Sequence, residues 1–92
     1  MFAINKSKGF QITFENNVTL SVQFGPNNYC ANRHTSDDPE SSDYWKSIDA
    51  EVAIILPSGE LYDISDYDQV EGWQSVKDVC HWIEVASKLD TN

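Results

Sequence analysis

Two stretches near the start of the chain alternate between apolar and polar residues. In residues 10–14 (FQITF) and 18–24 (VTLSVQF) every second residue is apolar, which predicts two strands that each turn one face toward a core. Asn16 and Asn17 lie between them, and asparagine tolerates the positive φ angles of a tight hairpin turn. Residues 1–4 (MFAI) predict a short additional edge strand.

The second half of the chain contains a nearly continuous apolar run. Residues 50–56 (AEVAIIL) predict a strand in the interior of the sheet, because a nearly continuous apolar run is typical of a strand that is buried on both faces. Residues 57–60 (PSGE) are typical of a turn, and residues 61–64 (LYDI) predict a short return strand. Residues 65–73 (SDYDQVEGW) are interpreted as an acidic and aromatic connection.

The apolar period changes after Ser75. Apolar residues then recur at steps of three and four, which predicts an amphipathic helix whose apolar stripe is Val76, Val79, Cys80, Ile83 and Ala86. Ser75 and Asp78 have the spacing of a capping box, and Lys88 complements the helix dipole near the C-terminal end. Membership of the stripe predicts that the Cys80 thiol is buried.

These elements predict an α+β domain: an antiparallel sheet of four to five strands, built from two hairpins, with one C-terminal amphipathic helix packed on a face. The chain has 92 residues, so residues 1–92 are predicted to form a single domain. Residues 25–48 form a long irregular connection, and residues 35–48 are interpreted as a flexible acidic loop.

The charge of the chain disfavours anionic partners. The chain has fifteen acidic and six basic residues, which gives a net charge of −9 and a surface that repels nucleic acid and anionic membranes. Two cysteines without a CxxC spacing indicate a reducing compartment. The sequence lacks a signal-peptide pattern and a long apolar span, so we expect a soluble, cytoplasmic protein.

Acidic residues are absent between Glu15 and Asp37. Within that window, residues 21–34 (SVQFGPNNYCANRH) concentrate hydrogen-bonding and stacking groups that suit a small nucleotide. The candidate ligand-binding residues are Asn28, Tyr29, Asn32 and Arg33. The alternative is that Tyr29 packs under the loop while the asparagines stabilise turns.

From Asp37 onward there are fourteen acidic and three basic residues. Carboxylates spread over a small rigid domain can imitate the phosphates of a DNA duplex and occupy a basic groove. The candidate partner-binding residues are Asp37, Asp38, Glu40, Asp43, Asp63, Asp66 and Asp68. The alternative is an acidic surface that only maintains solubility.

Metal binding and catalysis have little support in the sequence. Two cysteines and two histidines are available as zinc ligands (Cys30, His34, Cys80 and His81), but adjacent helical residues point about 100° apart and rarely share one tetrahedral ion. The sequence lacks an EF-hand loop and the common catalytic motifs. We therefore predict a protein without a metal, a cofactor or enzymatic activity.

The helix has a second apolar flank formed by Trp82, Val85 and Leu89. Either this flank belongs to the core, or it is an association surface through which the C-terminal helix forms an oligomer.

The first hairpin and its exit, GFQITFENNVTLSVQFGPNNYCANR, resemble a family of small proteins from tailed bacteriophages and prophages. The segment AEVAIILPSGELYDI supports the resemblance, and VEGW before the helix does so more loosely. The family pattern has Asn-Gly in the turn and Gly-Asn-Tyr-Cys in the loop, where this chain has Asn16-Asn17 and Asn27-Asn28-Tyr29-Cys30. The family carries no assigned catalytic residues.

The resemblance implies a phage accessory protein that acts in the host cytoplasm. Our leading hypothesis is a counter-defence binding protein that inhibits a host defence protein with a basic surface by DNA mimicry. One alternative is a sponge that sequesters a signalling nucleotide, and another is a phage assembly adaptor. No direct contact with nucleic acid or membrane is expected.

Overall fold

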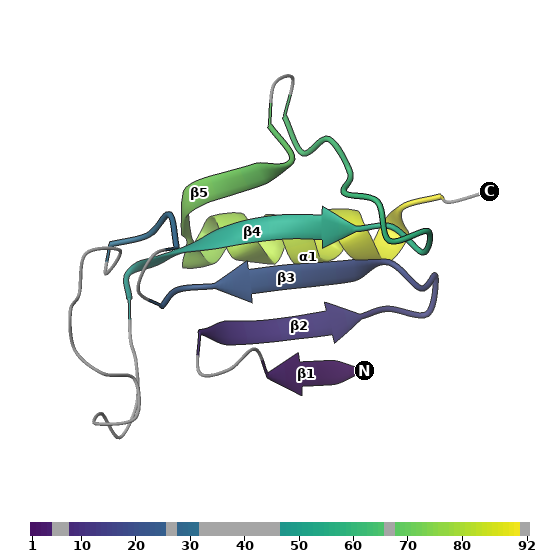
Figure 1. Cartoon of the computed structure of the whole chain (residues 1–92), viewed down its shortest axis with the longest axis horizontal. Helices are drawn as coiled ribbons and strands as arrows, with labels where there is room; N and C mark the ends of the chain where they lie inside the picture. Colours follow the sequence, from purple (N-terminus) through teal and green to yellow (C-terminus); the bar gives the residue numbers. More distant parts are fainter. Residues whose placement is uncertain (5–7, 26–27, 32–46, 66–67, 91–92) are drawn as a thin grey trace.

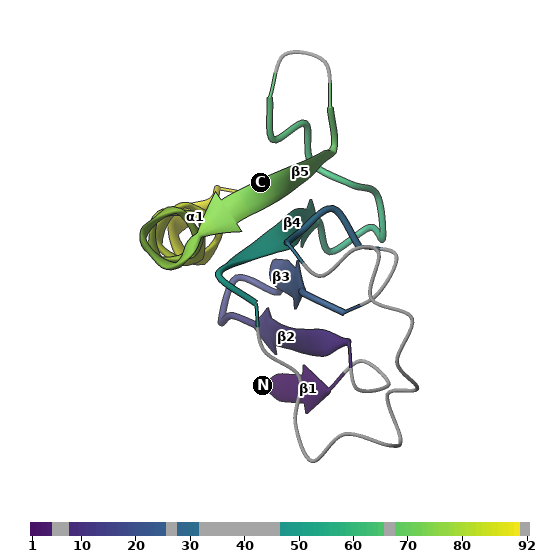
Figure 2. The ribbon, with the colours of Figure 1, turned by 90° about the vertical axis from the view of Figure 1, so that its left-hand side faces the viewer.

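The computed structural model describes residues 1–4, 8–25, 28–31, 47–65 and 68–90 (Figure 1). The elements are β1 (Phe2–Ile4), β2 (Gly9–Thr13), β3 (Thr19–Gln23), β4 (Asp49–Ile55), β5 (Val70–Ser75) and α1 (Val76–Lys88). The five strands form one sheet in chain order, and each neighbouring pair is antiparallel. Helix α1 lies along one face of this sheet (Figure 2). The predicted α+β fold is confirmed, with five strands.

The first hairpin forms as predicted. Phe14 donates its N–H to the Val18 carbonyl at 2.9 Å, and Asn17 donates its N–H to the Phe14 carbonyl at 2.9 Å. Asn17 has a φ of 64°, the left-handed conformation that a three-residue hairpin loop requires at this place. The Asn16 side chain has a different role: its amide donates to the carbonyls of Ala86 and Leu89 at 2.9 and 3.0 Å. The hairpin turn therefore satisfies two backbone acceptors at the C-terminal end of α1.

The partner of β4 differs from the prediction. The prediction of a return strand at residues 61–64 is wrong, because this segment contributes only the bridge between Ile55 and Leu61. Ile64 is 8% exposed and packs into the core. The strand beside β4 is β5, which lies within and just beyond the segment interpreted as a connection. The pairing of β4 with β5 shifts register between Ala50 and Val52, so a simple alternating pattern is missing.

The core lies between α1 and the face of β3 and β4 that α1 covers. Its largest fully buried side chains include Leu20, Val52 and Ile54. Cross-strand pairing aligns Leu20 with Ile54 and Val22 with Val52, so these side chains form one apolar layer. The segment 35–46 of the predicted flexible loop lies outside the described residues.

Helix α1 begins as predicted and turns a partly different face to the sheet. Ser75 and Asp78 form a capping box, and the hydrogen bonds from Ser75 hold the pKa of Asp78 below its ordinary value. The prediction for Cys80 is wrong: this thiol is exposed, and Val76 is 74% exposed. The flank of Trp82, Val85 and Leu89 packs against the core, which is the first of the two interpretations of that flank.

Helix α1 does not cover the whole face of the sheet. Among the described elements, α1 packs against β3, β4 and β5. Phe2 pairs with Ile12 and Ile4 pairs with Phe10 on β2, yet Phe2 is 80% and Ile4 is 83% exposed. The face of β1 and β2 that continues the core layer therefore lies open beside the helix.

Candidate functional site

Residues 28–31 cross the helix-free side of the sheet, near the start of β4 and the second half of β5 (Figure 2). The Glu51 carboxylate accepts the N–H of Tyr29 at 2.8 Å, and the Asp49 carboxylate accepts the N–H of Ala31 at 2.6 Å. Trp73 donates its own N–H to the Tyr29 carbonyl at 2.8 Å. Two side chains of β4 and one backbone group of β5 thus attach this segment to the sheet.

The side chain of Asn28, which is 7% exposed, also holds the segment in place through hydrogen bonds. Its side-chain oxygen accepts the N–H of Gly25 at 3.1 Å, and its amide nitrogen donates to Gln23 at 2.9 Å. The neighbouring Cys30 is 1% exposed, and its thiol donates to the Gly25 carbonyl at 3.7 Å. Asn28 and Cys30 therefore act on the structure of the segment itself.

Of the four predicted ligand-binding residues, the structure places two. Asn28 is buried and engaged at both ends of its amide, as described above, while Tyr29 turns its ring toward the surface with 42% exposure. Asn32 and Arg33 lie outside the described residues.

The ring of Tyr29 is stacked on the ring of Trp73. The ring centroids are 5.6 Å apart, and the planes are inclined by 30°. Trp73 is 58% exposed, although an aromatic pair of this size is more stable when it is covered. Its φ is 52°, a left-handed conformation that costs a bulky residue roughly 1–2 kcal/mol. The chain therefore maintains a strained backbone at a tryptophan that is presented to the surface.

Gly72 allows the two segments to approach each other. A Cβ atom at residue 72 would lie 2.5 Å from the Cβ of Tyr29 and 3.0 Å from its carbonyl oxygen. Any larger residue would push the Tyr29 segment away from β5. The exposed aromatic pair therefore depends on a glycine that precedes one of its members.

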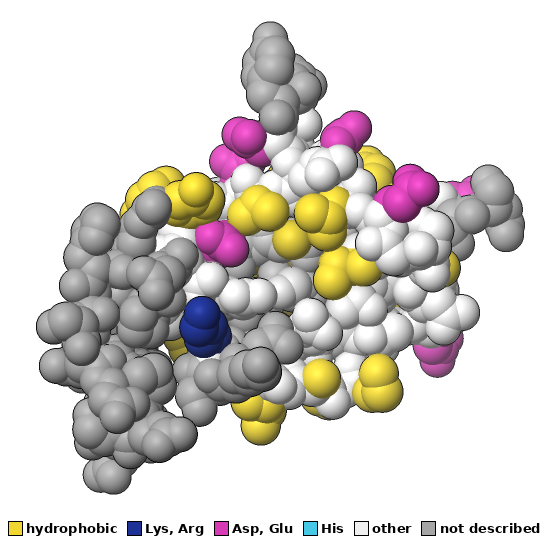
Figure 3. All heavy atoms as spheres, viewed as in Figure 1, with side chains coloured by type: hydrophobic (Ala, Val, Ile, Leu, Met, Phe, Trp, Pro, Cys, Tyr) yellow, Lys and Arg dark blue, Asp and Glu magenta, His cyan; other side chains and the backbone are white. Residues whose placement is uncertain are grey.

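We call Tyr29, Trp73, Asp49 and Glu51 the aromatic–carboxylate cluster. Figure 3 shows hydrophobic side chains gathered at the end of β5 with an acidic side chain beside them. The N–H groups of Tyr29 and Ala31 already bind the two carboxylates, so an incoming phosphate would meet negative charge and occupied donors. A guanidinium group is suited to this surface, because it can stack on an aromatic face and bind a carboxylate at once. The electrostatics of the cluster favour a cation.

The structure describes two of the seven predicted partner-binding acids. Asp63 and Asp68 are exposed on the connection before β5, where Asp63 accepts a hydrogen bond from Gln69 at 3.2 Å and Asp68 lies in a turn with Ser65. This connection leads into the start of β5, whereas Trp73 lies toward its end. The other five acids lie outside the described residues, namely Asp37, Asp38, Glu40, Asp43 and Asp66.

Few acidic residues are paired with a cation of the described part of the chain. Within the described ranges, the one ion pair joins Glu84 to Lys88 at 2.8 Å, and this lysine lowers the pKa of Glu84. Figure 3 shows several acidic side chains along the edge of the helix-free face, some of them beside β5 and the connection that precedes it. The negative potential therefore surrounds this face and is not confined to one loop.

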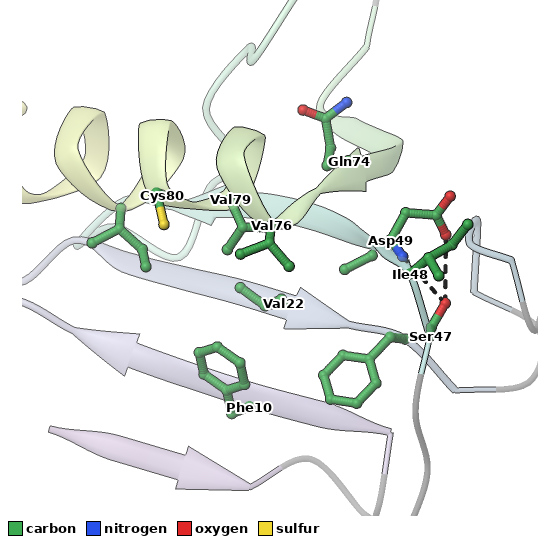
Figure 4. Close-up of a pocket in the computed structure, with 12 residues that line it drawn as sticks. Phe10, Val22, Ser47, Ile48, Asp49, Gln74, Val76, Val79 and Cys80 are labelled. Carbon is green, nitrogen blue, oxygen red and sulfur yellow. Dashed lines mark hydrogen bonds between the residues drawn. The ribbon is translucent and has the colours of Figure 1, made fainter.

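A pocket of about 400 Å³ lies on the other face of the sheet, between α1 and strands β2 to β4 (Figure 4). Its apolar lining includes Phe10, Val22, Phe24, Val76, Val79 and Ile83. Figure 4 shows Ser47 and Asp49 together at one end, joined by hydrogen bonds. No sequence pattern indicated this pocket, because its two walls come from segments that are far apart in the chain.

The absence of a metal site remains a prediction from the sequence. Among the described residues, no group of three metal-binding side chains is found. Cys80 belongs to α1 and is exposed, whereas Cys30 is buried in the segment 28–31. His34 lies outside the described residues.

The fold and site define a small α+β domain that presents a stacked aromatic pair beside two carboxylates, with an apolar pocket behind the same end of the sheet. Comparisons of the chain with protein-family models, curated proteins and solved structures found no match. Across the described ranges, no helix has the length and apolarity needed to cross a bilayer.

Proposed function

We propose that this chain is a non-enzymatic binding protein that recognises a basic partner protein through the aromatic–carboxylate cluster. The observation that carries the proposal is the exposed stack of Tyr29 on Trp73, held beside Glu51 and Asp49. Tyrosine and tryptophan are enriched among the residues that contribute most to protein–protein binding. Carboxylates next to them favour arginine and lysine side chains.

The excess of acidic residues adds a long-range electrostatic attraction to a basic partner. With a net charge of −9, the chain attracts a basic protein before contact, which chiefly raises the association rate. The exposed carboxylates of Asp63 and Asp68 contribute to this attraction from outside the cluster. A protein whose groove normally binds nucleic acid has the complementary potential.

The biological setting that we propose follows from the resemblance to small phage proteins. The chain would act in the cytoplasm of the host cell and occupy the basic nucleic-acid groove of a defence protein, which inhibits that protein. The hypothesis of a nucleotide sponge has less support in the geometry, because Asn28 and the N–H groups of Tyr29 and Ala31 have partners within the protein.

A short unstructured peptide with arginines separated by glycine and serine, called the arginine peptide below, serves as a probe for such a partner. We expect the Kd of the arginine peptide, measured by isothermal titration calorimetry, to rise steeply as salt is increased toward about 1 M, where the Debye length is roughly 3 Å. A peptide with glutamine in place of arginine is the control and should not bind. A Kd that does not change with salt would contradict recognition through charge.

A further inference from the structure

The apolar pocket lies open at its rim. Two of the apolar residues around it are largely exposed, with Ile48 at 81% and Val76 at 74%, and the pocket has a volume of about 400 Å³. Pockets that receive ligands or side chains commonly fall within roughly 300–1,000 Å³ and combine an apolar lining with a few polar groups. Phe10 and Val22 on the sheet face Val79 and Cys80 on the helix across this space (Figure 4).

The pocket and the aromatic–carboxylate cluster lie on opposite faces of the sheet and share one residue at its end. Asp49 belongs to both: its carboxylate accepts the N–H of Ala31 on the helix-free side, and the same residue lines the pocket. Of the consecutive residues Trp73 and Gln74, the first belongs to the cluster and the second to the pocket. Trp73 stacks on Tyr29, while Gln74 pairs with Ala50 and lines the pocket.

Charge at the rim indicates the kind of segment that fits. Asp49 is the charged residue among those that line the pocket, so the polar end of the pocket favours a positively charged neighbour. Apart from Ser47 and Gln74, the remainder of the lining is apolar and favours an aliphatic or aromatic side chain. A segment with a basic residue next to an apolar one matches both parts.

We propose that the pocket receives an apolar side chain of the same basic partner, so that the recognised segment carries leucine-like and arginine residues close together. This inference rests on the proposed function, because the cluster would hold the arginine. Burying a leucine side chain in the pocket is expected to strengthen binding roughly tenfold to hundredfold.

Two peptides test the inference. The first is the arginine peptide, and the second replaces its serines with leucines (the arginine–leucine peptide). We expect the arginine–leucine peptide to bind at least about tenfold more tightly. It should also slow alkylation of Cys80 by iodoacetamide, since this thiol lines the pocket and is exposed. Cys30 is buried and serves as the unreactive internal reference.

The variant Val76→Glu supplies the matched control. It places a charge at the rim of the pocket, in the first turn of α1, where an acidic residue suits the helix dipole and the fold. The variant should remove the advantage of the leucines and leave binding of the arginine peptide intact.

The outcomes separate the two proposals. If both peptides bind equally and Cys80 reacts at an unchanged rate, the pocket inference is overturned while the proposed function stands. If neither peptide binds, both are overturned. Protection of Cys80 that increases with protein concentration in the absence of peptide would assign the pocket to a second copy of the chain, which also overturns the inference.

Discussion

Replacing Trp73 with glycine is expected to weaken binding of the arginine peptide by roughly tenfold or more, as is typical when an aromatic residue at the centre of an interface is truncated. The domain should remain folded. Glycine adopts the observed φ of 52° without strain, which recovers roughly 1–2 kcal/mol, whereas the lost stack on Tyr29 is worth roughly 0.5–1.5 kcal/mol. The buried part of the indole is lost as well, so urea denaturation should give a free energy of unfolding that is lowered by no more than about 1–3 kcal/mol.

The variant Trp73→Phe is the matched control, because it keeps an aromatic ring at the same backbone position. We expect it to retain most of the affinity for the arginine peptide. If Trp73→Gly bound the peptide as tightly as the wild type, the cluster would not be the recognition site, and the charge of other surfaces would have to account for binding.

Truncation of Leu20 to alanine is expected to lower the free energy of unfolding by about 2–5 kcal/mol, the usual range for a leucine in a packed core. Leu20 is fully buried and is aligned with Ile12 and Ile54 on the neighbouring strands. A domain of this kind has a total stability of about 5–15 kcal/mol, so a large part of it would be lost. Urea denaturation followed by circular dichroism measures the change.

Ile4→Ala is the control for this experiment. Ile4 lies on the face of the sheet that carries the core layer, but it is 83% exposed, so its truncation should cost less than about 1 kcal/mol. An equally large loss in both variants would mean that β1 is covered in solution, and the boundary of the helix-covered core at β2 would then be wrong.

The regular elements were predictable where a period was complete. The hairpin of β2 and β3 alternates strictly, and α1 carries both a capping box and a helical period, so both were placed correctly. Strand β5 was missed because Gly72 and the positive φ of Trp73 interrupt any alternation. Residues 61–64 look more like a strand in sequence. In the structure, however, Ile64 is buried in the core and the segment pairs with β4 through a single bridge.

The exposure of Cys80 could not be derived from helical spacing. A period of 3.6 residues identifies apolar positions around a helix, but two flanks were apolar in α1, and the one that is covered depends on where the helix crosses the sheet. Because α1 crosses β3, β4 and β5 and leaves β1 and β2 open, Trp82 is packed on the core while Cys80 lies at the pocket rim.

Of the four residues of the aromatic–carboxylate cluster, only Tyr29 was identified from the sequence, by its polar and acid-free surroundings. The acidic residues predicted from composition include neither Asp49 nor Glu51. The contact between Tyr29 and Trp73 depends on a sheet that joins distant segments, and no local pattern encodes it. The role of Glu51 and Asp49 as acceptors for the loop was hidden for the same reason, since both were assigned only to a strand or its edge.

The most direct test of recognition at the aromatic–carboxylate cluster is a two-dimensional ¹H–¹⁵N NMR titration of the labelled protein with the arginine peptide. The largest shifts should occur at the indole N–H of Trp73 and at the backbone N–H groups of Tyr29 and Ala31, which bind the two carboxylates. The indole N–H of Trp82, which donates to Gln74 at 2.7 Å, should remain nearly unchanged. Shifts centred on Asp63 and Asp68, with Trp73 unaffected, would contradict binding at the cluster.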